Sequence, residues 1–460
     1  MKRFYYFLST IIVAAVAIAC SSSDMEHNFK NPSEQVQTAV YWYWISGNIS
    51  KEGVVEDLKA MKRAGINRAF IGDIGQDGLY TERNVKIFSD EWWEVLHTAL
   101  KTASELGIEI GIFNSPGWSQ SGGPWVKPEQ AMRYLASSSY MVEGPRMVEL
   151  NVTPKDIADN GKPFQHVKTI AYPAPKGSAD SLSVEVKIVE GGAKDMAELT
   201  RAQKNVLILN LAEVATLRSL TLQPASRPML CAAHLEAEVE GEWRKIADFN
   251  IDRSNAGLNV GFTPYAHVTV SFAAVQTKSL RLTLDATSQA GGFLNVEVAS
   301  YAEKTLAKMC QTPLPYWDHY MWPDQVCLDD AAYAIDPSKV LDISDKVDAN
   351  GVLRWQVPAG EWVVMHTGMT PTGVTNSPAT PEATGLEIDK MSREHVASHF
   401  DAYIGEILRR IPAEDRTTFK VVVEDSYETG GQNFTDDMIH DFESTFGYSM
   451  IPYLPAYYGM

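Results

Sequence analysis

The sequence has 460 residues, of which 45% are hydrophobic and 21% charged, so the chain should form ordinary globular cores in two or three domains. Its 40 basic and 58 acidic residues give a net charge of −18, which argues against binding nucleic acid through phosphates and suits a neutral ligand such as a sugar. Eleven tryptophans could stack on sugar rings, although tryptophan is also common in cores.

The amino terminus has the features of a secretory signal. In MKRFYYFLSTIIVAAVAIACSSSD, Lys2 and Arg3 precede an apolar stretch that ends at Cys20. The AIAC ending is typical of a lipobox, where a peptidase cuts before a cysteine that is then lipidated, and the alternative is a plain signal peptide with an incidental cysteine. We expect residues 1–20 to be a lipoprotein signal peptide and residues 21–35 a tether. The exported chain would then be lipid-anchored in the outer membrane or facing the periplasm, and no other stretch could span a bilayer.

Residues 36–134 alternate between strand-like and helix-like segments. Apolar runs at 39–48, 66–75 and from 108 onward are expected to be strands. Two amphipathic helices are expected between them, the first bounded by Ser50 and Gly65 and the second by Ser89 and Gly107. This rhythm is typical of βαβ units with a parallel sheet.

The middle of the chain has a β pattern. Residues 135–305 contain short β-prone runs with alternating polarity and regular turn signals, which predict an inserted antiparallel β-sandwich. Residues 306–390 are expected to form a second small β region and connector, in which LRWQVPAGEWVVMHTGM is a hairpin turning at PAGE. Cys310 and Cys327 could pair in an oxidising compartment, a point that the sequence leaves open.

The βα pattern resumes in residues 391–460. Ser392 is expected to cap a helix that Pro412 ends, and the strand FKVVVEDS and a helix from Asp437 to Phe446 follow. The fold class expected is therefore α/β, with a partial (β/α)8 TIM-type barrel of about four strands that is interrupted by inserted antiparallel β-sandwich domains and apparently truncated.

Aromatic and polar side chains gather at the expected carboxyl ends of these strands, which share one face in a parallel barrel. The set consists of Trp42, Trp44, Asp73, Asn114, Trp118, Glu424, Asp425 and Glu428. Tryptophan covers the apolar face of a sugar ring, while amides and carboxylates bind its hydroxyls. Each residue could instead have a purely structural role, in the core or as a helix cap. The hypothesis of a sugar site therefore depends on all of them occurring together.

Several long motifs carry a family resemblance. They are YWYWISGNISKEGVVEDLKAMKRAGI (41–66), PGWSQSGGPWVKPEQAM (116–132), TPTGVTNSPATPEATGLEIDK (370–390) and the segment 421–459, which begins VVVEDSYETGG. From about residue 36 to the end, the chain resembles the inverting α-L-rhamnosidases of glycoside hydrolase family 106. The resemblance implies a (β/α)8 barrel with β insertions, and a rhamnose-containing oligo- or polysaccharide as the substrate.

The resemblance also implies roles for individual carboxylates. Glu428 in DSYETG occupies the place of the family's general acid, which must keep its proton near neutral pH. Glu424 and Asp425 would orient the site or hold calcium, which the family suggests as the ion, and Glu387 and Asp389 are further candidate ligands. No organic cofactor is expected. Because family members continue far beyond this length, with the general base in the later part, we expect an amino-terminal portion that does not hydrolyse rhamnosides by itself.

Two other functions remain open from the sequence. A retaining glycosidase could use Glu424 and Glu428 as its pair, with carboxyl groups ~5 Å apart rather than the ~6.5–9.5 Å typical of inversion. The chain could instead be a surface glycan-binding lipoprotein without hydrolytic activity, in which the predicted sandwich binds the glycan. This comparison with carbohydrate-binding modules rests on fold alone.

Overall fold

The computed structural model describes residues 25–33, 38–79, 84–159, 161–177, 182–200, 203–225, 229–253, 267–285, 291–300, 331–424, 429, 431–458 and 460. Cys20, Cys310 and Cys327, with their predicted lipidation and pairing, lie outside this set. The chain divides into two compact units. The first contains residues 1–125, 376–385 and 398–426, and the second contains residues 126–375, 386–397 and 427–460. In the part of the chain that the structure describes, no helix combines the length and the apolar composition needed to cross a bilayer.

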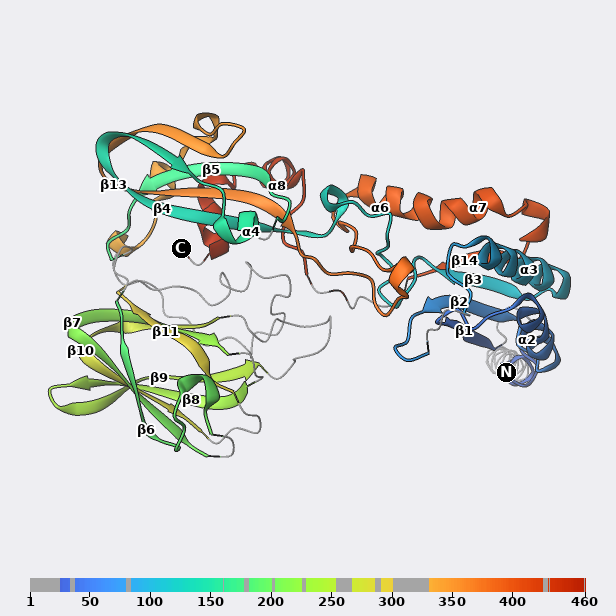
Figure 1. Cartoon of the computed structure of the whole chain (residues 1–460), viewed down its shortest axis with the longest axis horizontal. Helices are drawn as coiled ribbons and strands as arrows, with labels where there is room; N and C mark the ends of the chain where they lie inside the picture. The colour runs from blue at the N-terminus through green and yellow to red at the C-terminus, as the bar shows by residue number, and fades with distance from the viewer. Residues whose placement is uncertain are drawn as a thin grey trace, which may run out of the picture. The chain divides into compact units, whose positions relative to one another are not determined.

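The first unit is built on a four-stranded parallel sheet with the order β1-β2-β3-β14 (Figure 1). Its strands are β1 (Ala39–Ile45), β2 (Arg68–Ile74), β3 (Glu109–Phe113) and β14 (Phe419–Val423). The four strands expected from the βα rhythm are thus confirmed, and β14 joins β3 in spite of the long insertion between them. The sheet is open, and no closed barrel forms within the described residues.

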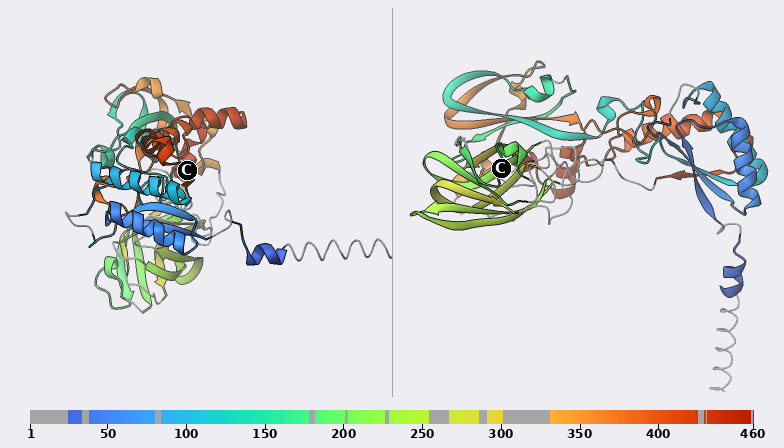
Figure 2. Two further views of the ribbon diagram at one scale, coloured as in Figure 1. Left: turned by 90° about the vertical axis from the view of Figure 1, so that its right-hand side faces the viewer. Right: turned by 60° about the horizontal axis from the view of Figure 1, so that its bottom comes forward.

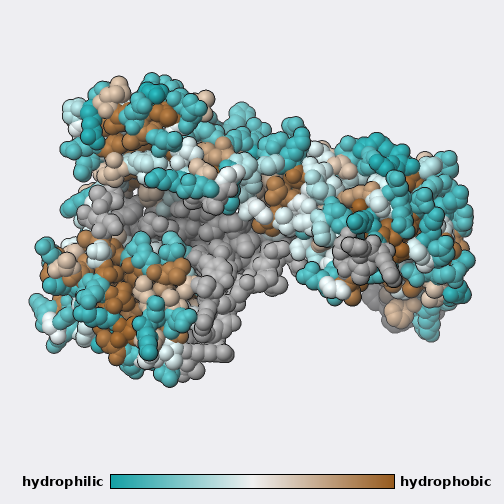
Figure 3. Space-filling model, viewed as in Figure 1, coloured by the Kyte–Doolittle hydropathy of each residue, from teal (hydrophilic) through white to brown (hydrophobic). Residues whose placement is uncertain are grey.

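Two capped helices cover this sheet. The side chain of Ser50 accepts a hydrogen bond at the start of α2 (Lys51–Arg63), and that of Ser89 does so at the start of α3 (Asp90–Leu106), as predicted. Gly107 ends α3 in the left-handed conformation, with φ of 67°. The apolar faces of both helices pack on Trp44, Ile71 and neighbouring side chains of the sheet, while their outer faces are hydrophilic (Figure 3).

The helix expected after Ser392 is interrupted by a π-helical turn. It consists of α6 (Arg393–Phe400), the turn at Asp401–Gly405, and α7 (Glu406–Arg410), after which Pro412 follows. A π turn inserts an extra residue and so changes which side chains face inward. The predicted apolar stripe is therefore split. Its members Tyr403, Ile404 and Ile407 are buried, whereas Val396, Phe400 and Leu408 are partly exposed.

The second unit contains a four-stranded antiparallel sheet with the order β12-β5-β13-β4. The strands are β4 (Arg133–Asn151), β5 (Gln165–Pro173), β12 (Leu341–Asp342) and β13 (Val352–Pro371), and the short helix α4 (Lys155–Asp159) joins β4 to β5. The predicted hairpin at PAGE is wrong, because β13 continues through this segment as one strand. Gly360 pairs with Gly144, and the register shifts between Val357 and Gly360, so the turn residues form a bulge in a long strand.

The six other strands of the second unit form one antiparallel sheet with the order β11-β7-β10-β8-β9, to which β6 adds beside β7. These strands are coloured green to yellow in Figure 2. They are β6 (Glu185–Glu190), β7 (Asn205–Pro224), β8 (Met229–Val239), β9 (Glu242–Arg253), β10 (Val268–Leu284) and β11 (Phe293–Ala299). Two strands of the region predicted to form the sandwich, β4 and β5, do not join this sheet, because they pair with β13 in the other sheet. The long strands β7 and β10 keep this sheet continuous, and register shifts near the middle of β10 bend it around its own core.

Candidate functional site

Two predicted site residues meet at the carboxyl ends of neighbouring strands. Asn114 directly follows β3, Glu424 directly follows β14, and Asn114 Nδ2 donates a hydrogen bond of 2.5 Å to Glu424 Oε1. The asparagine is buried, and its Oδ1 has no hydrogen-bond partner in the described part of the chain, while the glutamate is exposed. The pair thus places an amide oxygen and a carboxylate side by side, which is a suitable arrangement for binding hydroxyl groups.

The buried His399 hydrogen-bonds the main chain of Asn114. Indole nitrogens only donate, so the 3.0 Å contact from Trp125 Nε1 makes His399 Nδ1 an acceptor. The imidazole proton therefore sits on Nε2, which donates to the main-chain oxygen of Asn114 over 3.1 Å. Trp125 also stacks on Tyr403, with ring centroids 5.5 Å apart. Our sequence reasoning missed His399, because a polar position in an amphipathic helix gives no local sign of such partners.

Asp73 lies at the end of β2 with its carboxyl group enclosed. Although part of the residue is accessible, Oδ2 is buried, and Oδ1 accepts a 3.3 Å hydrogen bond from Trp92 Nε1. Burial raises the pKa of the Asp73 carboxyl to about 7, and hydrogen bonds from Trp92 and Tyr403 only partly oppose this. The carboxyl group faces the helix layer, so it does not share the exposed edge with Glu424.

The two tryptophans of β1 are core residues. Trp42 and Trp44 are 8% and 2% exposed and pack edge to face, and Trp42 Nε1 donates to Asp57. They do not present flat faces to a ligand, because alternate side chains of a strand point to opposite faces and these two point toward the helices. The exposed aromatic rings of β1 are instead those of Tyr41 and Tyr43 on the other face, which stack at 5.6 Å.

The remaining predicted site residues lie on loops. Trp118 is 40% exposed, and its backbone N–H is held by the main-chain oxygen of Ser377 at 3.0 Å. Trp118 follows Asn114 by four positions, in the segment after β3. Asp425 and Glu428 lie outside the described residues.

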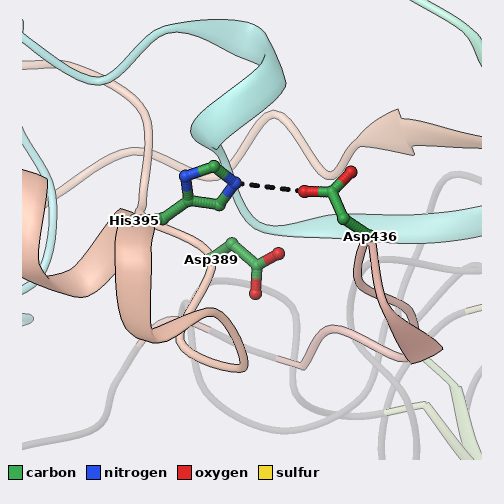
Figure 4. Close-up of side chains that lie close together, drawn as sticks. All are labelled: Asp389, His395 and Asp436. Atoms are coloured by element: carbon green, nitrogen blue, oxygen red, sulfur yellow. Dashed lines mark hydrogen bonds and ion pairs between the residues drawn. The ribbon is translucent and has the colours of Figure 1, made fainter. Parts of the chain in front are cut away.

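The second unit contains a separate charged cluster that includes Asp389, His395 and Asp436 (Figure 4). Arg133, which is 2% exposed, donates to both aspartates, from Nη2 to Asp389 at 3.0 Å and to Asp436 at 2.7 Å. The side chains of Gln432 and Thr435 also donate to Asp389. Sequence reasoning had selected only Asp389 from this cluster.

This cluster does not fit a metal ion. Both carboxylate oxygens of Asp389 accept hydrogen bonds, and the guanidinium of Arg133 already supplies the opposite charge. Glu387 is also fully buried beside a cation, since its Oε2 lies 2.8 Å from Lys390 Nζ. The two candidate calcium ligands in this segment are therefore already bound by cationic side chains.

Comparison with known proteins shows similarity over nearly the whole chain. A family model described as alpha-L-rhamnosidase matches residues 30–460. The structure of a rhamnosidase from Novosphingobium sp. PP1Y is similar over 95% of this chain and 42% of that chain, with a TM-score of 0.75 and 26% sequence identity. A curated protein of Formosa agariphila, named "Putative beta-glucuronidase", is 25% identical over all of this chain and 29% of its own length. The chain thus spans less than half the length of either relative.

Proposed function

The chain belongs to the alpha-L-rhamnosidase family of glycoside hydrolases, and from this premise we propose that it carries part of the sugar site of an enzyme that hydrolyses rhamnose-containing glycans. The observation that supports this best is the contact between Asn114 and Glu424. It lies at the carboxyl ends of parallel strands, the edge at which βα barrels hold their substrates. In this proposal, the exposed carboxylate and the amide oxygen bind hydroxyls of one rhamnose ring, and Trp118 lies against the sugar.

The proposed reaction is hydrolysis with inversion. Glu428 gives its proton to the glycosidic oxygen as the bond to the anomeric carbon breaks, and the aglycone leaves as an alcohol. A water molecule attacks the opposite face of the anomeric carbon and loses a proton to a second carboxylate, which acts as the general base. The motif EDSYE places Glu428 four positions after Glu424, so in the sequence the acid follows closely on the same strand.

We further propose that calcium binds at this edge. Glu424 and Asn114 would supply oxygen ligands, because hard carboxylate and amide oxygens suit this ion, and the bound ion would contact sugar hydroxyls. A thermal shift measurement tests this without activity. Calcium should raise the melting temperature of the full chain, and Glu424→Gln should abolish that rise, whereas Glu443→Gln, on the exposed surface of α8 (Met438–Phe446), should leave it unchanged. Equal rises in both variants would contradict the assignment.

Hydrolysis of an aryl α-L-rhamnoside, followed by NMR of the first anomer released, tests the reaction. Inversion predicts that β-rhamnose appears first, and Glu428→Gln should abolish hydrolysis while sugar binding persists. Initial release of α-rhamnose would support a retaining pair of Glu424 and Glu428 instead. Binding of rhamnosides without any turnover is expected if the general base is supplied by another part of the enzyme, as the family resemblance implies, and it is also the result expected of a glycan-binding module.

We also propose that the chain is exported and anchored by lipid at Cys20. The AIAC motif at the end of the apolar leader supports this. Cells that express the chain and are fed a labelled fatty acid should incorporate the label into it, and Cys20→Ala should remove the label. Labelling of the Cys20→Ala variant would show that the lipid is attached elsewhere.

A further inference from the structure

Three buried polar atoms of the first unit come together at one small cavity. Trp44 Nε1, Asp73 Oδ2 and Thr380 Oγ1 are each buried without a hydrogen-bond partner among the described residues, and all three residues line the same cavity. Trp92 and Tyr403 hydrogen-bond the Asp73 carboxyl group but leave Oδ2 without a partner. Trp44 is only 2% exposed. A buried polar atom without a partner carries a free-energy cost, so three such atoms at one place indicate a bound polar group.

The size of the cavity limits what it can hold. Its walls come from the ends of β1 and β2 and from loop residues, which are Gly47, Val85, Ile87, Pro116, Thr380 and Ala383. The space open to the centre of a water molecule is about 10 Å³. That is about the room that one buried water needs. A sugar ring, a phosphate or a carboxylate ligand is too large for this space.

The polar atoms also limit the chemistry of the occupant. The indole of Trp44 only donates, so the occupant must present a lone pair, and this disfavours a metal ion at that position. The Thr380 hydroxyl and the Asp73 carboxyl group can each donate or accept. A water molecule, with two protons and two lone pairs, matches all three. We propose that this cavity is the binding site of one ordered water molecule, which accepts a hydrogen bond from Trp44 Nε1 and is also bonded to Asp73 Oδ2 and Thr380 Oγ1.

The bound water joins three segments at the carboxyl edge of the sheet. Trp44 and Asp73 belong to β1 and β2, and Thr380 belongs to residues 376–385. This third segment also holds the backbone of Trp118 through Ser377. The water is therefore a structural part of the support beneath the candidate sugar site, and it solvates the carboxyl group whose pKa is raised by burial.

A crystal structure of the full chain at a resolution that shows ordered water tests the site directly. One density peak is expected within hydrogen-bond distance, ~2.7–3.2 Å, of all three atoms. Side chains that turn to bond one another, with no peak between them, would overturn the proposal. So would an apolar atom filling the cavity.

A matched pair of variants gives an independent test in solution. Thr370 of β13 is fully buried, and its Oγ1, like that of the partly exposed Thr380, is buried without a partner among the described residues, but Thr370 does not line this cavity. If Thr380 binds water, Thr380→Val should lower the local folding equilibrium constant about fivefold, read from hydrogen exchange of β1 and β2 amides. Thr370→Val should leave exchange in β13 unchanged or slower, because it removes an unsatisfied hydroxyl. If Thr380→Val behaves like Thr370→Val, the cavity does not bind water through Thr380.

Discussion

His399 Nε2 lies 3.1 Å from the main-chain oxygen of Asn114, although 285 positions separate the two residues in the chain. The histidine is therefore a positioning residue. Its imidazole connects the indole of Trp125 to the end of β3, and the side chain of Asn114 continues the hydrogen bonds to the Glu424 carboxylate. The orientation of an exposed carboxylate thus depends on buried groups behind it.

We predict that His399→Phe destabilises the first unit by about 2–4 kcal/mol, because it leaves the Trp125 indole N–H and the Asn114 oxygen buried without partners. Denaturant unfolding of the full chain checks this. His97→Phe is the matched control, because His97 is partly exposed and pairs with Asp415 at the surface, and its loss should cost less than about 1 kcal/mol. Equal costs for the two variants would contradict the role assigned to His399.

Asp73 predicts a pH dependence of stability. Its pKa rises from an ordinary value of 3.8 to about 7 in the folded chain. Between these values the folded state keeps a proton that the unfolded state has lost, so the free energy of unfolding falls as pH rises through this window. Asp73→Asn cannot titrate, so it should become more stable relative to wild type between pH 4 and pH 8, by an amount on the order of a few kcal/mol. A difference between the two proteins that stays constant across urea titrations at several pH values would show that Asp73 titrates normally.

Arg133 predicts a large loss of stability on substitution. Arg133→Met leaves the fully buried carboxylate of Asp389 without its cation, which should cost about 3–5 kcal/mol. Arg354→Met removes a comparable double ion pair, with Glu149 and Asp348, from the exposed face of β13 and should cost less than about 1 kcal/mol. Thermal unfolding of both variants makes the comparison. If the two melting temperatures shift equally, the buried network does not hold the second unit together.

We predict that substitution of Gly47 causes a steric clash that substitution of Gly65 does not. Both Gly47 and Gly65 have positive φ, at 72° and 80°, so Ala at either position adds about 1–2 kcal/mol of backbone strain. At Gly47 a Cβ atom would also lie 2.0 Å from the main-chain oxygen of Val85, while at Gly65 no atom lies within 4 Å. Gly47→Ala should therefore cost at least twice as much as Gly65→Ala in chemical unfolding. A smaller cost at Gly47 would mean that the loop carrying Val85 moves freely.

Much of the first unit could be predicted because its signals are local. Runs of β-branched residues indicate strands, and the serines that cap α2 and α3, like the glycine that ends α3, stand beside the helices they bound. The meeting of Asn114 with Glu424 also followed, since both residues end parallel strands. The split stripe around Tyr403 did not, because a π-helical turn has no comparable sequence signal.

Other features depend on partners that are distant in the sequence. The sequence PAGE predicts a turn, but Gly144 lies opposite it on β4 and allows both strands to bend together. The indole of Trp42 could stack on a sugar or fill a core, and only the direction in which its strand faces the helices decides between these. Arg133 donates hydrogen bonds to the carboxylates of Asp389 and Asp436, which are more than 250 positions away in the sequence. No local sequence pattern predicts these contacts.

The neighbouring strands β3 and β14 also set the order of events during synthesis. The edge of β3 that faces β14 can be paired only after the ribosome has made the whole β-rich insertion between these two strands, since Asn114 and Glu424 are 310 positions apart. At about 5–20 residues per second, the nascent chain would carry this bare strand edge for tens of seconds. An unpaired edge is a template for aggregation, so transient protection by a chaperone at this stage should decide how much of the chain reaches its native form.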